Sequence, residues 1–180
     1  MKDLSLHVLD IVQNAIVAKS KEIVVEINEN SCDDQLIITI MDDGIGMSQE
    51  TLNKVMDPFF TTRTVRQVGL GIPLIKMAAE RCNGGIIVDS KVGQGTKVQA
   101  SFQLSHIDRA PLGKMEETIM TLLNNGQEFV LKYNHQVNDK IFSLDTNELE
   151  NLLEGVPINE PSVLLWVKEY VKEGLAQLRN

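Results

Sequence analysis

The sequence has 180 residues, of which 43% are apolar and 4% aromatic, and a formal net charge of −8. This length suits one domain, or one domain with a small appendage, and the core must consist mainly of aliphatic side chains. The negative charge argues against nucleic acid as the main partner, because a phosphate backbone calls for a basic face. No apolar run reaches the roughly 18 residues that span a bilayer, and the first residues do not resemble a signal peptide. With two cysteines in no metal-binding spacing, we expect a reduced, cytoplasmic protein with no membrane partner.

The first predicted element is an amphipathic helix over residues 3–19, whose apolar residues recur at spacings of three and four: Leu6, Leu9, Val12 and Ile16. His7, Asp10 and Asn14 fall on one stripe of this helix. Such a stripe is most often a solvated face. Apolar residues on several sides of the helix nevertheless favour burial, and a buried Asp–Asn pair needs a partner such as a cation or ligand.

Two strands are predicted next, over residues 22–28 and 35–41. The second ends in Met41-Asp42-Asp43-Gly44-Ile45-Gly46-Met47. A strand that stops at Asp and turns through Gly-x-Gly brings one carboxylate and bare backbone to a single place. Taken alone, this pattern is more often an ordinary turn. Ser48 is a plausible N-cap for a short helix that follows.

Residues 57–71 show no helical or strand period and contain hydroxyl and guanidinium groups: Thr61, Thr62, Arg63 and Arg66. These groups suit a loop that closes over phosphates, although a solvated surface loop has the same composition. The segment Gly69-Leu70-Gly71 then leads into a helix predicted over residues 72–81. Exposed N–H groups at the start of a helix favour an anion. Strands over 86–90 and 97–104 follow, joined by Gly93-Gln94-Gly95-Thr96.

Taken in this order, the motifs resemble the ATP-binding domain of the GHKL superfamily, which includes gyrase, heat-shock chaperone, histidine kinase and mismatch-repair ATPases. Asp10-Ile11-Val12-Gln13-Asn14-Ala15 resembles the N box, and Asp42-Asp43-Gly44-Ile45-Gly46 the first glycine box. Asp57-Pro58-Phe59-Phe60-Thr61-Thr62-Arg63 is similar to the F box of bacterial histidine kinases. Gly69-Leu70-Gly71 and Gly93-Gln94-Gly95-Thr96 match the second and third glycine boxes. The resemblance implies an α+β fold, a two-layer sandwich of a mixed sheet with helices on one face.

The resemblance also implies roles for single residues. Asp42 would accept the adenine amino group, with Thr96 supporting the same base edge through a water, while Asp43 has no fixed role. Gly44 and Gly46 would let the backbone approach the purine. Asn14 would bind Mg²⁺ through its amide oxygen. The lid over the phosphates would contain Thr61, Thr62, Arg63 and Arg66, and the amides of Gly69, Leu70 and Gly71 would hold the phosphates.

Three features depart from the family pattern. Gln67 occupies the first glycine position of the second glycine box, and the lid between Phe60 and Gly69 is very short. Hydrolytic members of the superfamily place a Glu four residues before the Asn, whereas this chain has Asp10. Its carboxylate is one methylene shorter, so it could either act as a base or only orient waters on Mg²⁺.

Residues 106–180 lie outside the resemblance, so we predict two domains, 1–105 and 106–180. A linker over 105–111 precedes a helix with one apolar face (Met115, Ile119, Leu122 and Leu123) and a hairpin over 129–133 and 140–144. Two further helices follow, the first capped by Asp145 and the second after Pro161. This α-β-β-α-α appendage has no catalytic constellation. We expect His106 and His135 to be structural or solvated, and Trp166 to lie in the core.

The resemblance implies an ATP- and Mg²⁺-binding, histidine-kinase-like protein of signal transduction that acts as a phosphotransferase on a partner protein in trans, with Arg63 neutralising charge. No phosphoacceptor helix precedes the ATP domain in this sequence. Two alternatives stay open: a slow ATPase switch with Asp10 as the base, and a nucleotide-sensing subunit of a larger complex without chemistry.

Overall fold

The structure, a computed structural model, describes residues 2–57 and 71–180. In these residues the helices are α1 (Leu4–Val17), α2 (Gln49–Met56), α3 (Gly71–Arg81), α4 (Met115–Leu123), α5 (Thr146–Leu152) and α6 (Pro161–Leu178). The strands are β1 (Glu22–Asn30), β2 (Gln35–Asp42), β3 (Gly85–Lys91), β4 (Gly95–Gln103), β5 (Val130–Val137) and β6 (Lys140–Asp145). The helices and strands predicted from the sequence pattern are therefore present, with ends that differ by a few residues.

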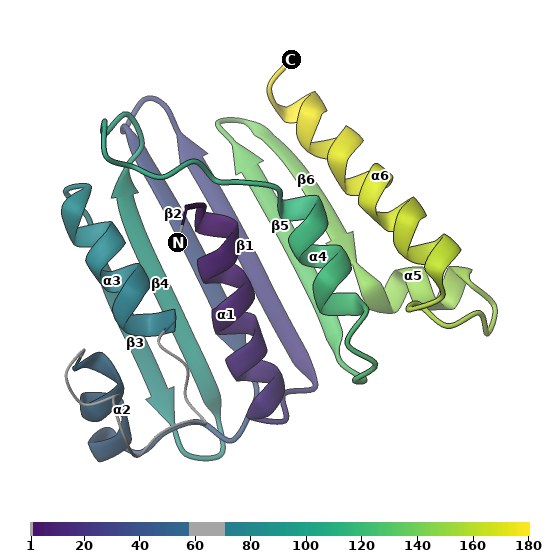
Figure 1. Cartoon of the computed structure of the whole chain (residues 1–180), viewed down its shortest axis with the longest axis horizontal. Coiled ribbons are helices and arrows are strands. Elements are labelled where there is room, and N and C mark those ends of the chain that lie inside the picture. Colours follow the sequence, from purple (N-terminus) through teal and green to yellow (C-terminus); the bar gives the residue numbers. More distant parts are fainter. Residues whose placement is uncertain (1, 58–70) are drawn as a thin grey trace.

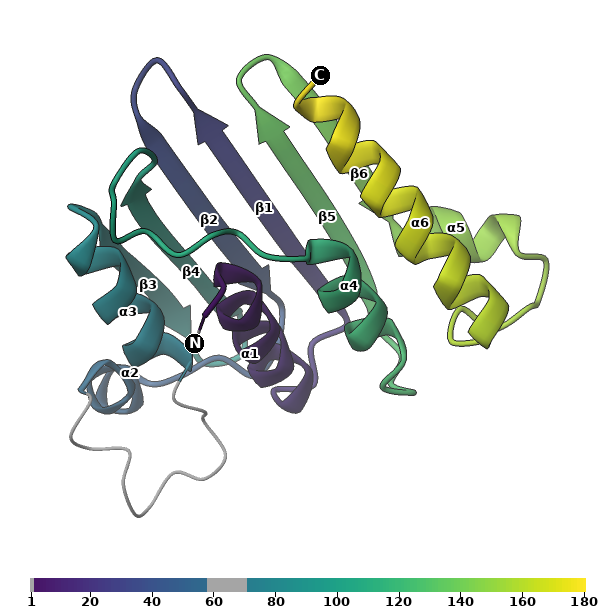
Figure 2. The ribbon, with the colours of Figure 1, turned by 45° about the horizontal axis from the view of Figure 1, so that its top comes forward.

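The strands form one mixed sheet in the order β3-β4-β2-β1-β5-β6. Neighbouring strands are antiparallel except for β1 and β5, which run parallel. Helices α1, α3, α4 and α6 lie over one face of the sheet (Figures 1 and 2), and no helix of the described residues covers the other face. The predicted α+β sandwich with helices on one side is confirmed.

The core lies between the sheet and these helices because both contribute periodic apolar faces. On β1, Ile23, Val25 and Ile27 are buried, whereas Glu26 and Asn28, which point to the other face, are exposed. The face of α1 that meets the sheet is also aliphatic, with Leu4, Val8, Ile11 and Val12 buried. Each fully buried aliphatic side chain contributes about 1.5–3 kcal/mol, so aliphatic packing supplies most of the core stability in a chain with few aromatic residues.

The start of α1 is held by a distant part of the chain. The N–H of Leu4 donates to the carbonyl of Pro111 at 3.0 Å, and the N–H of Ser5 donates to that of Leu112 at 2.7 Å. The first N–H groups of a helix have no partner inside the helix, so these carbonyls take the place of a side-chain cap. The predicted linker therefore also fixes the position of α1.

The hairpin predicted in the appendage extends the sheet of the first segment. Strand β5 pairs with β1 from Glu22, opposite Val130, to Glu29, opposite Val137. Both predicted segments thus share one sheet, and their division into two domains at residue 105 stays a prediction.

A buried hydrogen-bonded chain ties this part of the sheet to α6. The Tyr133 hydroxyl lies 2.8 Å from Nδ1 of His135, whose Nε2 lies 2.8 Å from Oε1 of Glu29. Arg179, just beyond α6, donates to the same oxygen at 2.7 Å. Burial raises the pKa of Tyr133, so its hydroxyl keeps its proton and donates to Nδ1, which leaves Nε2–H to donate to Glu29. His135 has the structural role expected of it.

The prediction that Trp166 lies in the core is wrong. Its side chain is 54% exposed and stacks on Tyr170 with ring centroids 5.1 Å apart. The buried stripe of α6 contains Val163, Val167 and Val171. Position 166 lies off this stripe, on a side of the helix that does not face the core. In the chain as described, none of the helices is both long and apolar enough to cross a membrane.

Candidate functional site

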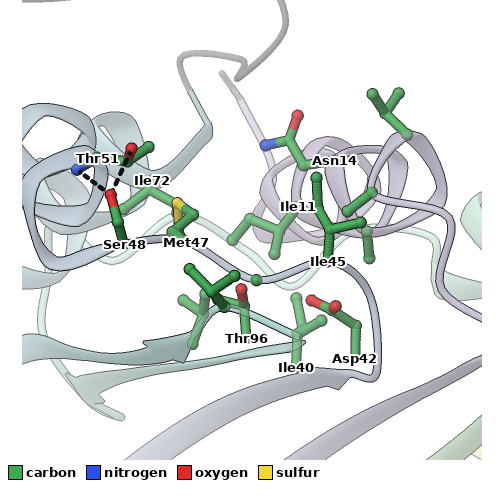
Figure 3. A pocket seen from close by; sticks show the side chains of 16 residues that line it. Ile11, Asn14, Ile40, Asp42, Ile45, Met47, Ser48, Thr51, Ile72 and Thr96 are labelled. Atoms are coloured by element: carbon green, nitrogen blue, oxygen red, sulfur yellow. Dashed lines mark hydrogen bonds between the residues drawn. The ribbon is translucent and has the colours of Figure 1, made fainter. Parts of the chain in front are cut away.

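A pocket with a cavity volume of about 450 Å³ lies between α1, the end of β2, the turn before α2, and β4 (Figure 3). This volume is in the range of small-molecule sites. Most of its lining is aliphatic or thioether: Ile11, Ala15, Ile40, Met47, Ile72 and Val98. Against this apolar wall stand a few polar groups, chiefly Asn14, Asp42 and Thr96. Such a lining suits a flat apolar ring with polar edges.

Asp42 is held in one orientation at the end of β2. The Ser20 hydroxyl donates to its Oδ1 at 3.0 Å, and the N–H of Gly44 donates to the same oxygen at 2.8 Å. Within the described residues the hydrogen bonds of the Asp42 carboxylate both go to Oδ1. Its Oδ2 is therefore available as an acceptor for a ligand, and Figure 3 shows this carboxylate pointing into the pocket.

Thr96 lies beside Asp42 because the two residues are directly opposite each other on β4 and β2. The next strand adds Ser90, which is opposite Thr96 and has its hydroxyl 2.8 Å from Oγ1 of Thr96. Ser90 also accepts the N–H of Met47 at 2.8 Å. Sequence reasoning missed Ser20 and Ser90, since neither belongs to a motif. Their positions become informative only when strand order and register are known.

Backbone hydrogen bonds hold three turns together at this end of the pocket. Ile45 N–H donates to the Ala18 carbonyl at 3.0 Å, and the Ile45 carbonyl accepts from Gly93 N–H at 2.7 Å. Gly46 has a φ of +67°, and a Cβ there would overlap the Lys91 carbonyl. The glycine at 46 thus lets the turns approach each other. That Gly44 and Gly46 also let a purine approach stays a prediction.

Asp43, which had no fixed role in the sequence, caps the start of β1. Its Oδ1 accepts the N–H of Lys21 at 2.8 Å and that of Glu22 at 3.0 Å. The two adjacent carboxylates therefore differ in kind: Asp43 satisfies backbone, whereas Asp42 faces the pocket.

The polar residues along one side of α1 lie in two different environments: Asn14 lines the pocket, and Asp10 lies beside the start of α3. Asn14 lines the pocket across from Asp42 and Thr96 (Figure 3). Asp10, one turn earlier, lies beside the start of α3, where a Cβ added to Gly71 would be 3.2 Å from Cβ of Asp10. Burial raises the pKa of Asp10 and lowers that of His7. Both side chains are thus biased toward their neutral forms.

The predicted phosphate-binding residues lie mostly outside the described residues: Thr61, Thr62, Arg63, Arg66, Gly69 and Leu70. Gly71 is the first residue of α3. In the described residues no group of three or more His, Cys, Asp or Glu side chains could hold a metal ion. That Asn14 would bind Mg²⁺ stays a prediction; its amide oxygen is a ligand of the type that Mg²⁺ prefers.

Comparison with known proteins identifies the fold family. Residues 2–106 match the family described as histidine kinase-, DNA gyrase B-, and HSP90-like ATPase. The chain belongs to this family. Among its relatives within the histidine kinase-like ATPases are a putative sensor protein of Shewanella frigidimarina, 30% identical over 102 residues, and sporulation kinase C of Bacillus subtilis, 30% identical over 96 residues. Sensor histidine kinase YxdK of Bacillus subtilis is 27% identical over 106 residues.

These matches cover 56%, 53% and 56% of this chain, but only 16%, 22% and 33% of the respective relatives. The similarity therefore lies in the ATPase domain of the histidine-kinase-like family, whose members bind ATP, usually with Mg²⁺.

Proposed function

We propose that this chain binds ATP with Mg²⁺ in the pocket described above and transfers the γ-phosphoryl group to a partner protein in trans. The observation that carries the proposal is the state of Asp42, whose Oδ1 is occupied by Ser20 and Gly44 while Oδ2 faces an aliphatic pocket. A carboxylate acceptor in an apolar slot matches the amino edge of adenine.

The remaining contacts to the base follow from the walls of the pocket. Thr96 adds a hydroxyl beside Asp42, and Ile40 and Val98 supply aliphatic surface on the sheet side. Ile11 and Ala15 lie on the α1 side. A planar base between two aliphatic walls removes apolar surface from water on both of its faces.

The other end of the nucleotide would point from Asn14 toward the start of α3. The Asn14 amide oxygen is a ligand of the type that Mg²⁺ prefers, and bound Mg²⁺ would neutralise charge on the phosphates. The first N–H groups of α3 favour an anion at Gly71. We assign Thr61, Thr62, Arg63 and Arg66 to the lid, with Arg63 stabilising the transferring group. Gly69 and Leu70 would extend the phosphate cradle.

Support for phosphotransfer over other uses of ATP comes from the relatives, which include a sporulation kinase and a sensor histidine kinase. In this mechanism the protein positions the γ-phosphoryl group and excludes water, while the partner brings the nucleophile. The partner would be a phosphoacceptor protein or a regulated complex.

A slow ATPase switch is the second candidate, and the environment of Asp10 favours it. This carboxylate lies beside Gly71 at the start of α3, and burial raises its pKa. A carboxylate with a raised pKa is a stronger base when ionised, which is what activation of water requires. The same group could instead orient waters on Mg²⁺ during phosphotransfer.

An experiment that follows the γ-phosphate separates these candidates. The full chain is incubated with Mg²⁺ and γ-labelled ATP, alone and with proteins that co-purify from the native cell. Phosphotransfer predicts label on one co-purified protein and little free phosphate without it. Phosphate release by the chain alone, lost in Asp10→Asn but kept in the control Asp89→Asn on the opposite face of the sheet, would support the ATPase. ATP binding with neither outcome would leave a nucleotide sensor and would contradict both enzymatic proposals.

A further inference from the structure

Three polar side chains form a row across the end of the sheet, on the face covered by helices. Asp42 on β2 is opposite Thr96 on β4, and Thr96 is opposite Ser90 on β3. Asp42 and Thr96 line the pocket. Ser90 does not line the pocket, but its hydroxyl lies 2.8 Å from Oγ1 of Thr96, which does.

The hydrogen bonds of Ser90 determine where its proton lies. Its hydroxyl oxygen accepts the N–H of Met47 at 2.8 Å and lies 3.1 Å from the carbonyl of Gly95 and 2.8 Å from Oγ1 of Thr96. A hydroxyl has one proton and two lone pairs. The Gly95 carbonyl can only accept, so it takes the Ser90 proton. The contact with Thr96 is then satisfied only when Thr96 donates.

This arrangement fixes the direction of the Thr96 hydroxyl. With its proton directed back to Ser90, Thr96 presents only lone pairs to the pocket. Oδ2 of Asp42, beside it, is also an acceptor, so the floor of the pocket offers acceptors alone. In the opposite arrangement Ser90 would donate to Thr96, and its contact with the Gly95 carbonyl would have no proton.

We infer that Ser90 is a positioning residue for base selectivity: by holding the proton of Thr96 away from the pocket, it favours a purine with an amino group at position 6 over one with an oxo group there. An amino group donates to the floor of the pocket, whereas an oxo oxygen meets lone pairs. The inference rests on the proposed nucleotide function. A site whose polar groups are all oriented to hydrogen-bond one ligand strongly rejects an analogue that lacks the matching group.

Ser90→Ala tests this inference because it frees the Thr96 hydroxyl to rotate and donate into the pocket. Dissociation constants for Mg-ATP and Mg-ITP, which differ in the substituent at position 6, are measured on the full chain. We expect the wild type to prefer ATP, and Ser90→Ala to lower the ATP-to-ITP preference by about 3- to 10-fold, the value of one hydrogen bond. In a Thr96→Val background, Ser90→Ala should leave the preference unchanged.

A matched control is Ser101→Ala on β4. Ser101 bonds to Gly85 of the neighbouring strand, as Ser90 bonds to Gly95, but it lies at the other end of the strand pair. Its loss should lower stability without changing the nucleotide preference. Ser90→Cys keeps the shape of the side chain but offers only a weak S–H donor and a weak sulfur acceptor. It should shift the preference in the same direction as Ser90→Ala, should the alanine variant fold poorly.

The outcomes separate this inference from the proposed function. Equal weakening of ATP and ITP binding in Ser90→Ala would show a packing role and overturn the inference, while ATP binding by the wild type would still stand. A shift of the same size in the Thr96→Val background would show that Ser90 does not act through Thr96, which also overturns it. Failure of the wild type to bind either nucleotide would refute the proposed function itself, and the inference with it.

Discussion

The Ser20 hydroxyl lies 3.0 Å from Oδ1 of Asp42 and donates to it, so the turn after α1 fixes the carboxylate at the end of β2. Ser20 is buried, with 5% of its surface exposed. With the N–H of Gly44 on the same oxygen, the carboxylate is oriented before any ligand arrives. Such preorganisation lowers the entropic cost of binding, because the carboxylate need not be ordered when the ligand binds.

Ser20→Ala should therefore weaken ATP binding without abolishing it. Loss of one orienting hydrogen bond predicts a rise in the dissociation constant of about 3- to 10-fold, because Gly44 still holds Asp42. Isothermal titration calorimetry with Mg-ATP measures this. Ser143→Ala, at an exposed position on β6, is the control and should leave the affinity unchanged. An unchanged affinity in Ser20→Ala would contradict the orienting role.

Asp10→Asn should stabilise the folded protein at neutral pH. Because burial raises the pKa of Asp10, the ionised carboxylate is penalised on folding. The penalty is complete above the raised pKa and disappears as the pH falls below the unfolded value of about 3.9. The melting temperature of Asp10→Asn should thus exceed that of the wild type at neutral pH, and the difference should vanish at about pH 3.

The control for this change is Asp89→Asn at an exposed position on β3, which should not alter the melting temperature at either pH. A lower melting temperature for Asp10→Asn at neutral pH would show that the carboxylate has a stabilising partner in the folded protein.

Arg179→Ala should destabilise the protein at neutral pH by about 1–2 kcal/mol, the lower part of the range for a hydrogen bond to a charged group, because the Arg179 side chain is 56% exposed and solvent screens its charge. Burial by itself would raise the pKa of Glu29, but the His135 hydrogen bond and the Arg179 charge outweigh it and place this pKa below its usual range. The resulting stability is present above the unfolded pKa of about 4.3 and is lost as the pH falls through the lowered folded value.

Urea unfolding at neutral and acid pH measures this effect. The deficit of Arg179→Ala should shrink as Glu29 becomes protonated in the wild type. Lys172→Ala removes an exposed ion pair with Glu169 on the same helix and should change stability little. Equal stability of Arg179→Ala and wild type at neutral pH would rule out the contribution assigned to the pair.

The elements that depend on local periodicity could be predicted from the sequence. The i, i+3 and i, i+4 spacing of α1 and the alternation in β1 predict both elements. Ser48 is confirmed as the cap of α2, accepting the N–H of Thr51 at 3.2 Å. Asn14, Asp42 and Thr96 were named from motifs, and the structure brings them to one pocket.

The rest depends on pairing between distant segments, which local pattern does not encode. The parallel pairing of β5 with β1 joins segments about a hundred positions apart in the chain. The row that places Ser90 behind Thr96 follows from register across three strands. The different roles of Asp42, which faces the pocket, and Asp43, which caps the start of β1, follow from which groups of distant segments each carboxylate can reach.

The most direct test of the account is the affinity of Asp42→Asn for Mg-ATP. If the amide oxygen keeps its bonds to Ser20 and Gly44, the amide nitrogen faces the pocket and opposes the adenine amino group. We predict that the affinity for Mg-ATP falls by about 10- to 100-fold while the melting temperature stays unchanged. Asp43→Asn, which keeps the acceptor oxygen for Lys21 and Glu22, should bind ATP as the wild type does. Wild-type affinity in Asp42→Asn would contradict the assignment of this pocket to the base of ATP.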